Sequence, residues 1–314
     1  MAALVGAAGL AACSTPPPEA AAPTTSTSDA TTTTTAPRLP AALPYTPAPG
    51  EVEAEAKTAA SLFLQKALTY DVGGGTVGEA RMRLAGMPAV PEAADKLAPL
   101  LRAGAAGEAD VVYPQLGGFA TTKASIMAVV RLRTLAGTDL EMVTRTFDVR
   151  VEKRQGQWTV VDVASLGGDP VPRPAVVSEA ARAVLDHPQI DLPDSARWDI
   201  HAGRIADRVL ELLAGIADAQ PVGVTVLSTG HPIQVFGGTS VSNHIPGRGF
   251  DLWKIGSPVI DQRDPNGPLR PVVERMLAEG VTELGAPFDL DGPKGANFAN
   301  LVHQDHLHVA FDRL

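Results

Sequence analysis

Helical and alternating patterns of apolar residues predict an α+β domain in residues 51–168. Residues 52–70 carry apolar side chains at helical spacing. From 147 to 151 apolar residues alternate with charged ones, Gln155-Gly156 follows as a turn, and the alternation resumes at 158–161. Alternation of this kind predicts an antiparallel hairpin with one buried face and one solvated face.

Residues 177–314 show a second set of the same signals. Apolar residues within 205–216 have the spacing of one helix face, and apolar residues alternate along 222–226 as in a strand. Two further strands are predicted at 250–255 and 306–311, and both contain acidic or histidine residues. Helix and strand signals within one segment predict a second mixed domain.

Composition divides the rest of the chain. Residues 169–176 are rich in proline, which interrupts helices and removes backbone donors, so we place the domain boundary there. Residues 14–50 are largely proline, threonine and alanine and have too little apolar surface to repay ordering. We therefore expect a disordered, semi-rigid tether at 14–50, behind a signal segment at 1–13.

The signal segment contains an apolar stretch at 2–12, too short to span a bilayer, and ends in Leu10-Ala11-Ala12-Cys13. This tetrapeptide resembles a bacterial lipobox, which implies that Cys13, the only cysteine, carries a lipid. We expect an exported lipoprotein, anchored in the membrane at its outer face and facing the cell wall. The net charge of −9 provides no basic surface, so we expect no nucleic-acid partner.

Histidines are concentrated near the C-terminus. Seven occur in 314 residues, and five of them follow residue 230. Imidazole nitrogens and carboxylate oxygens are the ligands of a catalytic zinc when three protein groups hold it and a fourth position stays open. We predict that His244, Asp251 and His308 form such a set. The five late histidines are His231, His244, His303, His306 and His308.

The spacing of His244 and Asp251 supports this hypothesis. They are seven residues apart, so a regular strand would place them on opposite faces. Gly247 and Gly249 permit a bend that directs both side chains to one point. Asp251 also lies in an otherwise apolar strand, where a buried carboxylate requires a cation or hydrogen bonds.

The late His-x-His motif has a similar geometry. His306 and His308 are two residues apart on a predicted strand and therefore project from the same face. One can bind the metal while the other lies beside the open coordination position. Asp305 just precedes this strand, where a turn can direct its carboxylate into the same space.

Together, Ser-x-His-x-x-Gly-x-Gly-x-Asp at 242–251 and the late His-x-His resemble the D-Ala-D-Ala carboxypeptidase and hedgehog-type zinc peptidases. In more detail, the chain resembles a group of actinobacterial exported lipoproteins of that type. The resemblance covers roughly residues 177–314. It implies a hedgehog-like or D-Ala-D-Ala-peptidase-like zinc domain with a central antiparallel sheet.

The resemblance also implies roles for individual residues. It implies Zn²⁺ on the three predicted ligands, and a catalytic carboxylate three residues before the last ligand, which is Asp305. With zinc making a water nucleophilic, Asp305 would take its proton and pass it to the leaving amine. The implied substrate is a peptidoglycan stem peptide, cut next to a D-amino acid. Carboxypeptidase and endopeptidase action both remain open.

One loop departs from the family pattern. The family usually has Ser-Gly-Tyr-Arg, whose arginine stabilises the oxyanion or holds substrate, whereas residues 228–231 read Ser-Thr-Gly-His. We predict that His231 and His306 stabilise the oxyanion, and that Ser242 and Arg248 contact substrate, with Arg248 supplying the positive charge. The departure favours an alternative function, a zinc-stabilised but non-catalytic lipoprotein that binds the cell wall or docks a protein.

The pattern of residues 51–168 resembles cystatin-like or nuclear-transport-factor-like domains. It shows no catalytic constellation, since Gly73-Gly74-Gly75 lacks the spacing and the Lys-Ser/Thr ending of a phosphate loop. We expect a spacer, or a docking domain for a protein partner. Deletion of this domain is expected to leave the zinc content unchanged.

Overall fold

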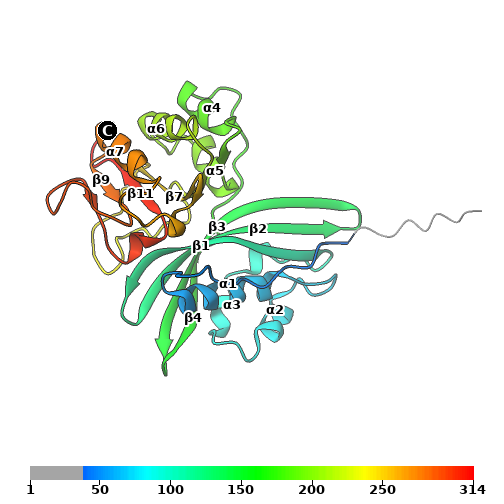
Figure 1. Cartoon of the computed structure of the whole chain (residues 1–314). Coiled ribbons are helices and arrows are strands. Elements are labelled where there is room, and N and C mark those ends of the chain that lie inside the picture. The colour runs from blue at the N-terminus through cyan, green and yellow to red at the C-terminus, as the bar shows by residue number, and fades with distance from the viewer. Residues whose placement is uncertain (1–37) are drawn as a thin grey trace, which may run out of the picture. The chain divides into compact units, whose positions relative to one another are not determined.

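The computed structural model describes residues 38–314. The predictions for the signal segment, for Cys13 and for most of the tether lie outside these residues. Within the described part, no helix has the length and apolar character needed to cross a membrane. Two separate hydrophobic cores, one built from residues between 52 and 163 and one from residues between 180 and 311, make a mixed α+β structure (Figure 1).

The first core lies between a four-stranded antiparallel sheet and the helices that precede it in sequence. Its elements are α1 (Ala54–Leu68), α2 (Val77–Leu84), α3 (Pro91–Asp95), a 3-10 turn (Ala98–Leu100), β1 (Ala106–Ala120), β2 (Lys123–Ala136), β3 (Asp139–Arg154) and β4 (Gln157–Ser165). The strand order is β1-β2-β3-β4, and α1 packs on the sheet through buried residues such as Phe63 and Leu64. The helix predicted at 52–70 is confirmed as α1.

The predicted hairpin is confirmed as β3 and β4. Gln155 and Gly156 connect the strands with φ angles of 51° and 82°. Two consecutive left-handed residues match the right-handed twist of the flanking strands, which explains the glycine at this position.

The expectation of one solvated face on this hairpin is wrong in its central part. The apolar residues between 147 and 151 point into the first core, as predicted, but Thr146 and Asp148 on the other face are buried as well. Thr146 Oγ1 donates to the carbonyl oxygen of Thr225, 2.6 Å away in the second domain. The second domain therefore covers this face of the sheet.

The second core surrounds a mixed sheet. Its elements are α4 (Glu179–Leu185), β5 (Ile190–Asp191), α5 (Asp194–His201), α6 (Asp207–Ala217), β6 (Val222–Val226), β7 (Gly249–Ile255), β8 (Ser257–Pro258), a 3-10 turn (Val259–Asp261), α7 (Arg270–Ala278), β9 (Glu283–Gly285), β10 (Asn297–Phe298), a 3-10 turn (Val302–Gln304) and β11 (Leu307–Ala310). The order is β10-β9-β11-β7-β6-β5, and β8 pairs with β7. The four central strands pair antiparallel, whereas β10-β9 and β6-β5 pair parallel.

The predicted elements of this domain are present at nearly the predicted places. The strands predicted at 222–226, 250–255 and 306–311 are β6, β7 and β11, and the helix predicted at 205–216 is α6. The apolar face of α6, formed by Val209, Leu212, Leu213 and Ile216, is buried in the second core.

The predicted linker at 169–176 and the predicted end of the tether at residue 50 both lie within the described residues. Residues 169–176, expected as a linker, contain no helix or strand. Part of the expected tether contacts the first domain: the backbone N–H of Tyr45 donates to Gln65 Oε1 at 2.8 Å, and Gln65 Nε2 donates to the carbonyl oxygen of Leu43 at 2.8 Å. The segment that packs on α1 thus begins before residue 51.

Candidate metal centre

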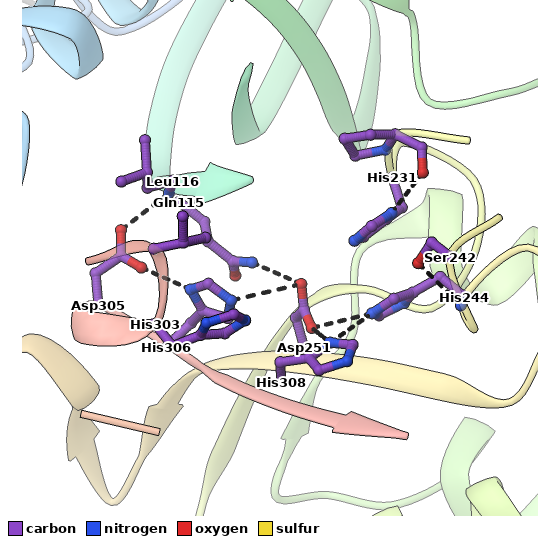
Figure 2. A network of polar contacts seen from close by, with 12 residues as sticks. Gln115, Leu116, His231, Ser242, His244, Asp251, His303, Asp305, His306 and His308 are labelled. Carbon is purple, nitrogen blue, oxygen red and sulfur yellow. Dashed lines mark hydrogen bonds and ion pairs between the residues drawn. The ribbon is translucent and has the colours of Figure 1, made fainter. Parts of the chain in front are cut away.

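Three buried side chains bring one ligand atom each to a common point (Figure 2). His244 Nε2 lies 3.1 Å from His308 Nδ1 and 3.1 Å from Asp251 Oδ1, and the latter two atoms are 3.0 Å apart. The structure therefore brings together the three residues that the two motifs predicted as zinc ligands.

Strand pairing and one glycine account for this convergence. Asp251 on β7 is the register partner of His308 on β11, so their side chains leave the sheet side by side. His244 lies in the turn before β7, and this turn ends at Gly247 with φ 71°. A Cβ on Gly247 would lie 1.8 Å from the carbonyl oxygen of Arg204, so only glycine fits. The predicted glycine bend is confirmed at Gly247.

The donor set fits a divalent cation. His244 Nδ1 lies 2.6 Å from the carbonyl oxygen of Leu227, and a carbonyl can only accept, so Nδ1 carries the proton and Nε2 offers its lone pair. Asp251 Oδ1 and a deprotonated His308 Nδ1 complete a triangle of acceptors, which repel one another unless a cation lies between them. Ligand atoms spaced in this way subtend roughly 95° at an ion about 2.1 Å from each, somewhat less than the tetrahedral angle of zinc.

His231 adds a fourth imidazole to this cluster. Its ring stacks on the His244 ring with centroids 4.0 Å apart and planes inclined by 11°, and ligand atoms of His231, His244 and Asp251 all lie within 4.8 Å of one another. His231 Nδ1 donates to the carbonyl oxygen of Pro232 at 2.8 Å. Burial, followed by the neighbouring His244, holds the pKa of His231 well below its usual value, so the ring is neutral.

This geometry disfavours the predicted role of His231. A neutral imidazole that donates through Nδ1 has only a lone pair at Nε2, and a lone pair cannot donate to an oxyanion. His231 is better suited to bind a cation than to stabilise an anion. The loop that carries His231 is held by Asp199 on α5, whose Oδ2 accepts from the backbone N–H groups of Ser228 at 3.1 Å and Thr229 at 2.7 Å.

His306 lies next to the three converging ligands, and Asp305 lies behind it (Figure 2). His306 Nε2 is 3.9 Å from Asp251 Oδ2, while His306 Nδ1 donates to Asp305 Oδ1 at 2.6 Å. The other carboxylate oxygen of Asp305 accepts from the backbone N–H of Leu116 at 2.9 Å and from Lys57 Nζ. Both oxygens of Asp305 are thus occupied at a distance from the metal position.

The predicted role of Asp305 therefore changes. Burial raises the pKa of Asp305, but the charge of Lys57 and the hydrogen bond from His306 lower it more, so the carboxylate stays ionised. An ionised acceptor on Nδ1 keeps the proton there and leaves His306 Nε2 free, directed toward Asp251. Asp305 thus orients His306, and His306 rather than Asp305 has a free nitrogen near the converging ligands.

Four groups of the first domain contact this centre, and the sequence interpretation missed all of them. Gln115 Nε2 on β1 donates to Asp251 Oδ2 at 2.6 Å, and Tyr113 Oη donates to the carbonyl oxygen of Asp305 at 3.0 Å. The other two are the Leu116 N–H and Lys57 Nζ. One signal was available: Lys57 lies on the apolar side of α1, where a lysine needs a buried partner.

Glu283 on β9 supports the outer side of His308. Its Oε1 lies 3.6 Å from His308 Nε2, and its Oε2 accepts from Asn243 Nδ2 at 2.6 Å. The neighbouring His308 lowers the pKa of Glu283 to about 2, against the effect of burial. Burial lowers the pKa of His308, but Asp251 and Glu283 raise it more, to about 9. Without a metal, a proton thus occupies the triangle of acceptors.

Of the two residues predicted to contact substrate, Ser242 and Arg248, only Ser242 lines the cavity beside the metal position. The Oγ of Ser242 accepts from the backbone N–H of His244 at 3.3 Å. The guanidinium of Arg248 donates to Asn243 Oδ1 at 2.6 Å and to the carbonyl oxygen of Asp312, so it holds the turn against the C-terminal segment.

A cavity of about 550 Å³ opens over the cluster. The first domain contributes part of its wall, and apolar residues of the 233–241 loop line it as well, with Val235 49% and Val241 59% exposed. His303 lines the same cavity, with its ring centroid 5.0 Å from that of His306. The lining residues include Gly117, Gly118 and Phe119 of the first domain and His231, His306 and His308 of the second.

Comparisons with family models, with curated proteins and with solved structures found no match for this chain.

Proposed function

We propose that this protein is a zinc-dependent peptidase that hydrolyses an amide bond in the stem peptides of peptidoglycan. The observation that carries the proposal is the buried triangle of His244, Asp251 and His308 at the floor of a cavity, with the Nε2 of His306 beside it. The spacing of the two motifs, which resembles that of zinc peptidases, supports the same reaction.

The reaction needs one metal and one proton carrier. Zinc held by His244, Asp251 and His308 would act as a Lewis acid and make a water molecule nucleophilic near neutral pH. His306 takes the proton of that water at Nε2 and returns it to the leaving amine, while Asp305 holds the opposite nitrogen. A positioned base of this type contributes about a hundredfold to ten-thousandfold to the rate.

The substrate assignment rests on the cavity and on the expected location. The cavity is lined by apolar side chains together with the polar groups of the candidate metal centre, which suits a short peptide lying across the metal position. Export and lipid attachment at Cys13 would place this site at the cell wall. Carboxypeptidase and endopeptidase action differ in whether the product is a free D-amino acid or a divided cross-link.

The test is digestion of purified muropeptides by the zinc-loaded protein, with products identified by mass spectrometry. We expect release of a D-amino acid or division of a cross-link, and loss of both in His308→Ala and in His306→Ala. His308→Ala should also lose zinc, whereas His306→Ala should keep it. One bound zinc per chain with intact muropeptides would contradict the peptidase proposal.

A second candidate function is a zinc-stabilised domain without catalytic activity. The observation that favours it is His231, whose free Nε2 lies near the same point as the other ligands. Four protein ligands close a zinc site, as in structural centres, whereas three leave a position for water. X-ray absorption spectroscopy on the zinc protein separates the two: three imidazoles and a carboxylate indicate the structural site, and two imidazoles with a water indicate the catalytic one.

A further inference from the structure

We infer that Lys57 of the first domain is a positioning residue of the metal centre: it holds Asp305, which in turn sets the proton of His306. The inference rests on the proposed function, because it assigns a catalytic purpose to a contact between two domains. Under this inference the first domain completes the active site.

Lys57 is a buried cation, so its charge needs compensating partners. Its side chain is fully buried on α1, and its Nζ lies 2.6 Å from Glu51 Oε1 and in contact with Asp305 Oδ2. It also lies over the ring of Tyr113, 5.3 Å from the centroid. A lysine in this environment is retained only if its charge is compensated, and the two carboxylates compensate it. The pair with Asp305 joins residues that are 248 positions apart.

The first domain holds two oxygen atoms of Asp305 with three donors. Lys57 Nζ and the Leu116 N–H both donate to Oδ2, and Tyr113 Oη donates to the backbone carbonyl oxygen. The remaining oxygen, Oδ1, accepts from His306 Nδ1 at 2.6 Å. Because the carboxylate cannot rotate away, the proton of His306 stays on Nδ1 and its Nε2 lone pair stays directed toward Asp251, whose Oδ2 is 3.9 Å away.

A purely structural role for the ion pair predicts different behaviour. The two domains are also joined away from the metal, for example by the Thr144 N–H, which donates to Asp194 Oδ2 at 2.8 Å. If Lys57 served only to join the domains, its loss would resemble the loss of that contact: lower stability with an unchanged His306. A positioning role requires instead that loss of Lys57 change the tautomer of His306 while the protein stays folded and keeps its zinc.

The experiment compares Lys57→Met with wild type in the full-length protein. Nitrogen-15 NMR of histidine-labelled protein, with and without zinc, reports the tautomer of His306 independently of activity. We expect a single Nδ1–H tautomer in wild type and a mixture in Lys57→Met. In muropeptide cleavage we expect kcat to fall by about a hundredfold, the scale of a misplaced general base, with KM within about twofold and one zinc retained.

Two matched controls accompany this variant. Lys66→Met makes the same substitution at an exposed position of the same helix, and Asp194→Ala removes an interdomain contact that lies away from the metal position. Both should keep the wild-type tautomer and kcat. If Lys57→Met does not fold, Lys57→Met combined with Glu51→Gln replaces it, because the second change removes the carboxylate left without its cation.

The outcomes separate the inference from the proposed function. An unchanged tautomer in folded Lys57→Met, or a changed tautomer with wild-type kcat, overturns the positioning role. A wild-type protein that binds zinc but cleaves no muropeptide overturns the peptidase proposal. In that case the tautomer comparison alone decides whether Lys57 positions His306.

Discussion

The two domains contribute to one centre in different ways. The second domain supplies the converging ligands from a pair of adjacent strands and the turn before them. The first domain supplies no ligand of that triangle. Its Gln115 donates to the ligand Asp251, and its Lys57 donates to Asp305, the partner of His306. The second domain thus carries the candidate ligands and His306, while the first domain carries the side chains that orient Asp251 and Asp305.

These contacts argue against the expectation that deletion of the first domain leaves the zinc content unchanged. A spacer domain could be removed without effect on zinc, but Gln115 donates directly to the carboxylate of Asp251. Groups that orient a metal ligand typically change metal affinity by about tenfold to a hundredfold when removed. The first domain is thus expected to influence zinc binding, and the sharpest tests alter one domain at a time.

The largest effect is expected from Asp251→Ala in the second domain. The substitution removes the only carboxylate of the triangle, so zinc affinity should fall by about a thousandfold or more, and stabilisation by zinc should disappear. Isothermal titration with zinc and thermal unfolding with and without zinc measure both quantities. His187→Ala, a histidine outside the cluster, serves as the control. Near-normal zinc affinity in Asp251→Ala would place the metal elsewhere.

The next effect is expected from Gln115→Leu in the first domain. Without the amide donor, Asp251 Oδ2 loses a charge-assisted hydrogen bond in a buried position, so zinc affinity should fall by about tenfold to a hundredfold. Zinc titration against a competing chelator measures this change, with Gln157→Leu, at an exposed position, as the control. An unaltered affinity would restore the description of the first domain as a spacer.

The pH dependence of zinc binding should reflect His308. Its pKa without metal is about 9, raised from 6.5, so below pH 9 zinc must displace a proton and its affinity should rise by about tenfold per pH unit. Above that pH the dependence should flatten. Titrations in buffers of different ionisation enthalpy give the proton count, and we expect about one proton released at pH 7. Release of none would show that the triangle is unprotonated.

The same shift has a consequence for stability without zinc. A group whose folded pKa is raised stabilises the fold fully below its unfolded pKa, and this contribution is lost as pH rises through the folded value. The zinc-free protein should therefore lose stability between pH 6.5 and pH 9. Urea unfolding across that range checks the direction, and a rise in stability there would contradict it.

The smallest effect is expected from Glu283→Gln. The ion pair with His308 spans 3.6 Å at a partly exposed position, where solvent weakens it, so zinc affinity should change by less than about tenfold. The pKa of His308 should move down from about 9, since one of the carboxylates that raise it is lost. Histidine NMR titration measures this shift. A loss as large as that of Gln115→Leu would give the outer contact equal importance.

Parts of the fold could be predicted because their causes are local. Gln155-Gly156 marked a hairpin turn, and the structure shows both residues in the left-handed conformation. The role of Gly247 could be predicted too, since a seven-residue separation cannot bring two side chains together without a bend. Each of these signals is contained within about ten residues of chain.

The remaining features depend on contacts that no local pattern contains. Thr146 and Asp148 have strand spacing typical of a solvated face, yet they are buried because the second domain covers them. Asp305 has the position of a base relative to His308 in sequence, yet Lys57 and Leu116 occupy one of its oxygens. Partners of this kind follow from how two cores pack, which alternation and spacing do not encode.

The sequence by itself indicated the mixed α+β structure and the residues that converge as candidate ligands. Alternation along a strand and the conformational freedom of glycine fix which side chains share a face. Only the tertiary structure decided that His306 faces the metal position while Asp305 supports it from behind, and that a lysine of the other domain holds that carboxylate. The reason is physical: a buried charge takes its role from the partners around it, and these came from a distant part of the chain.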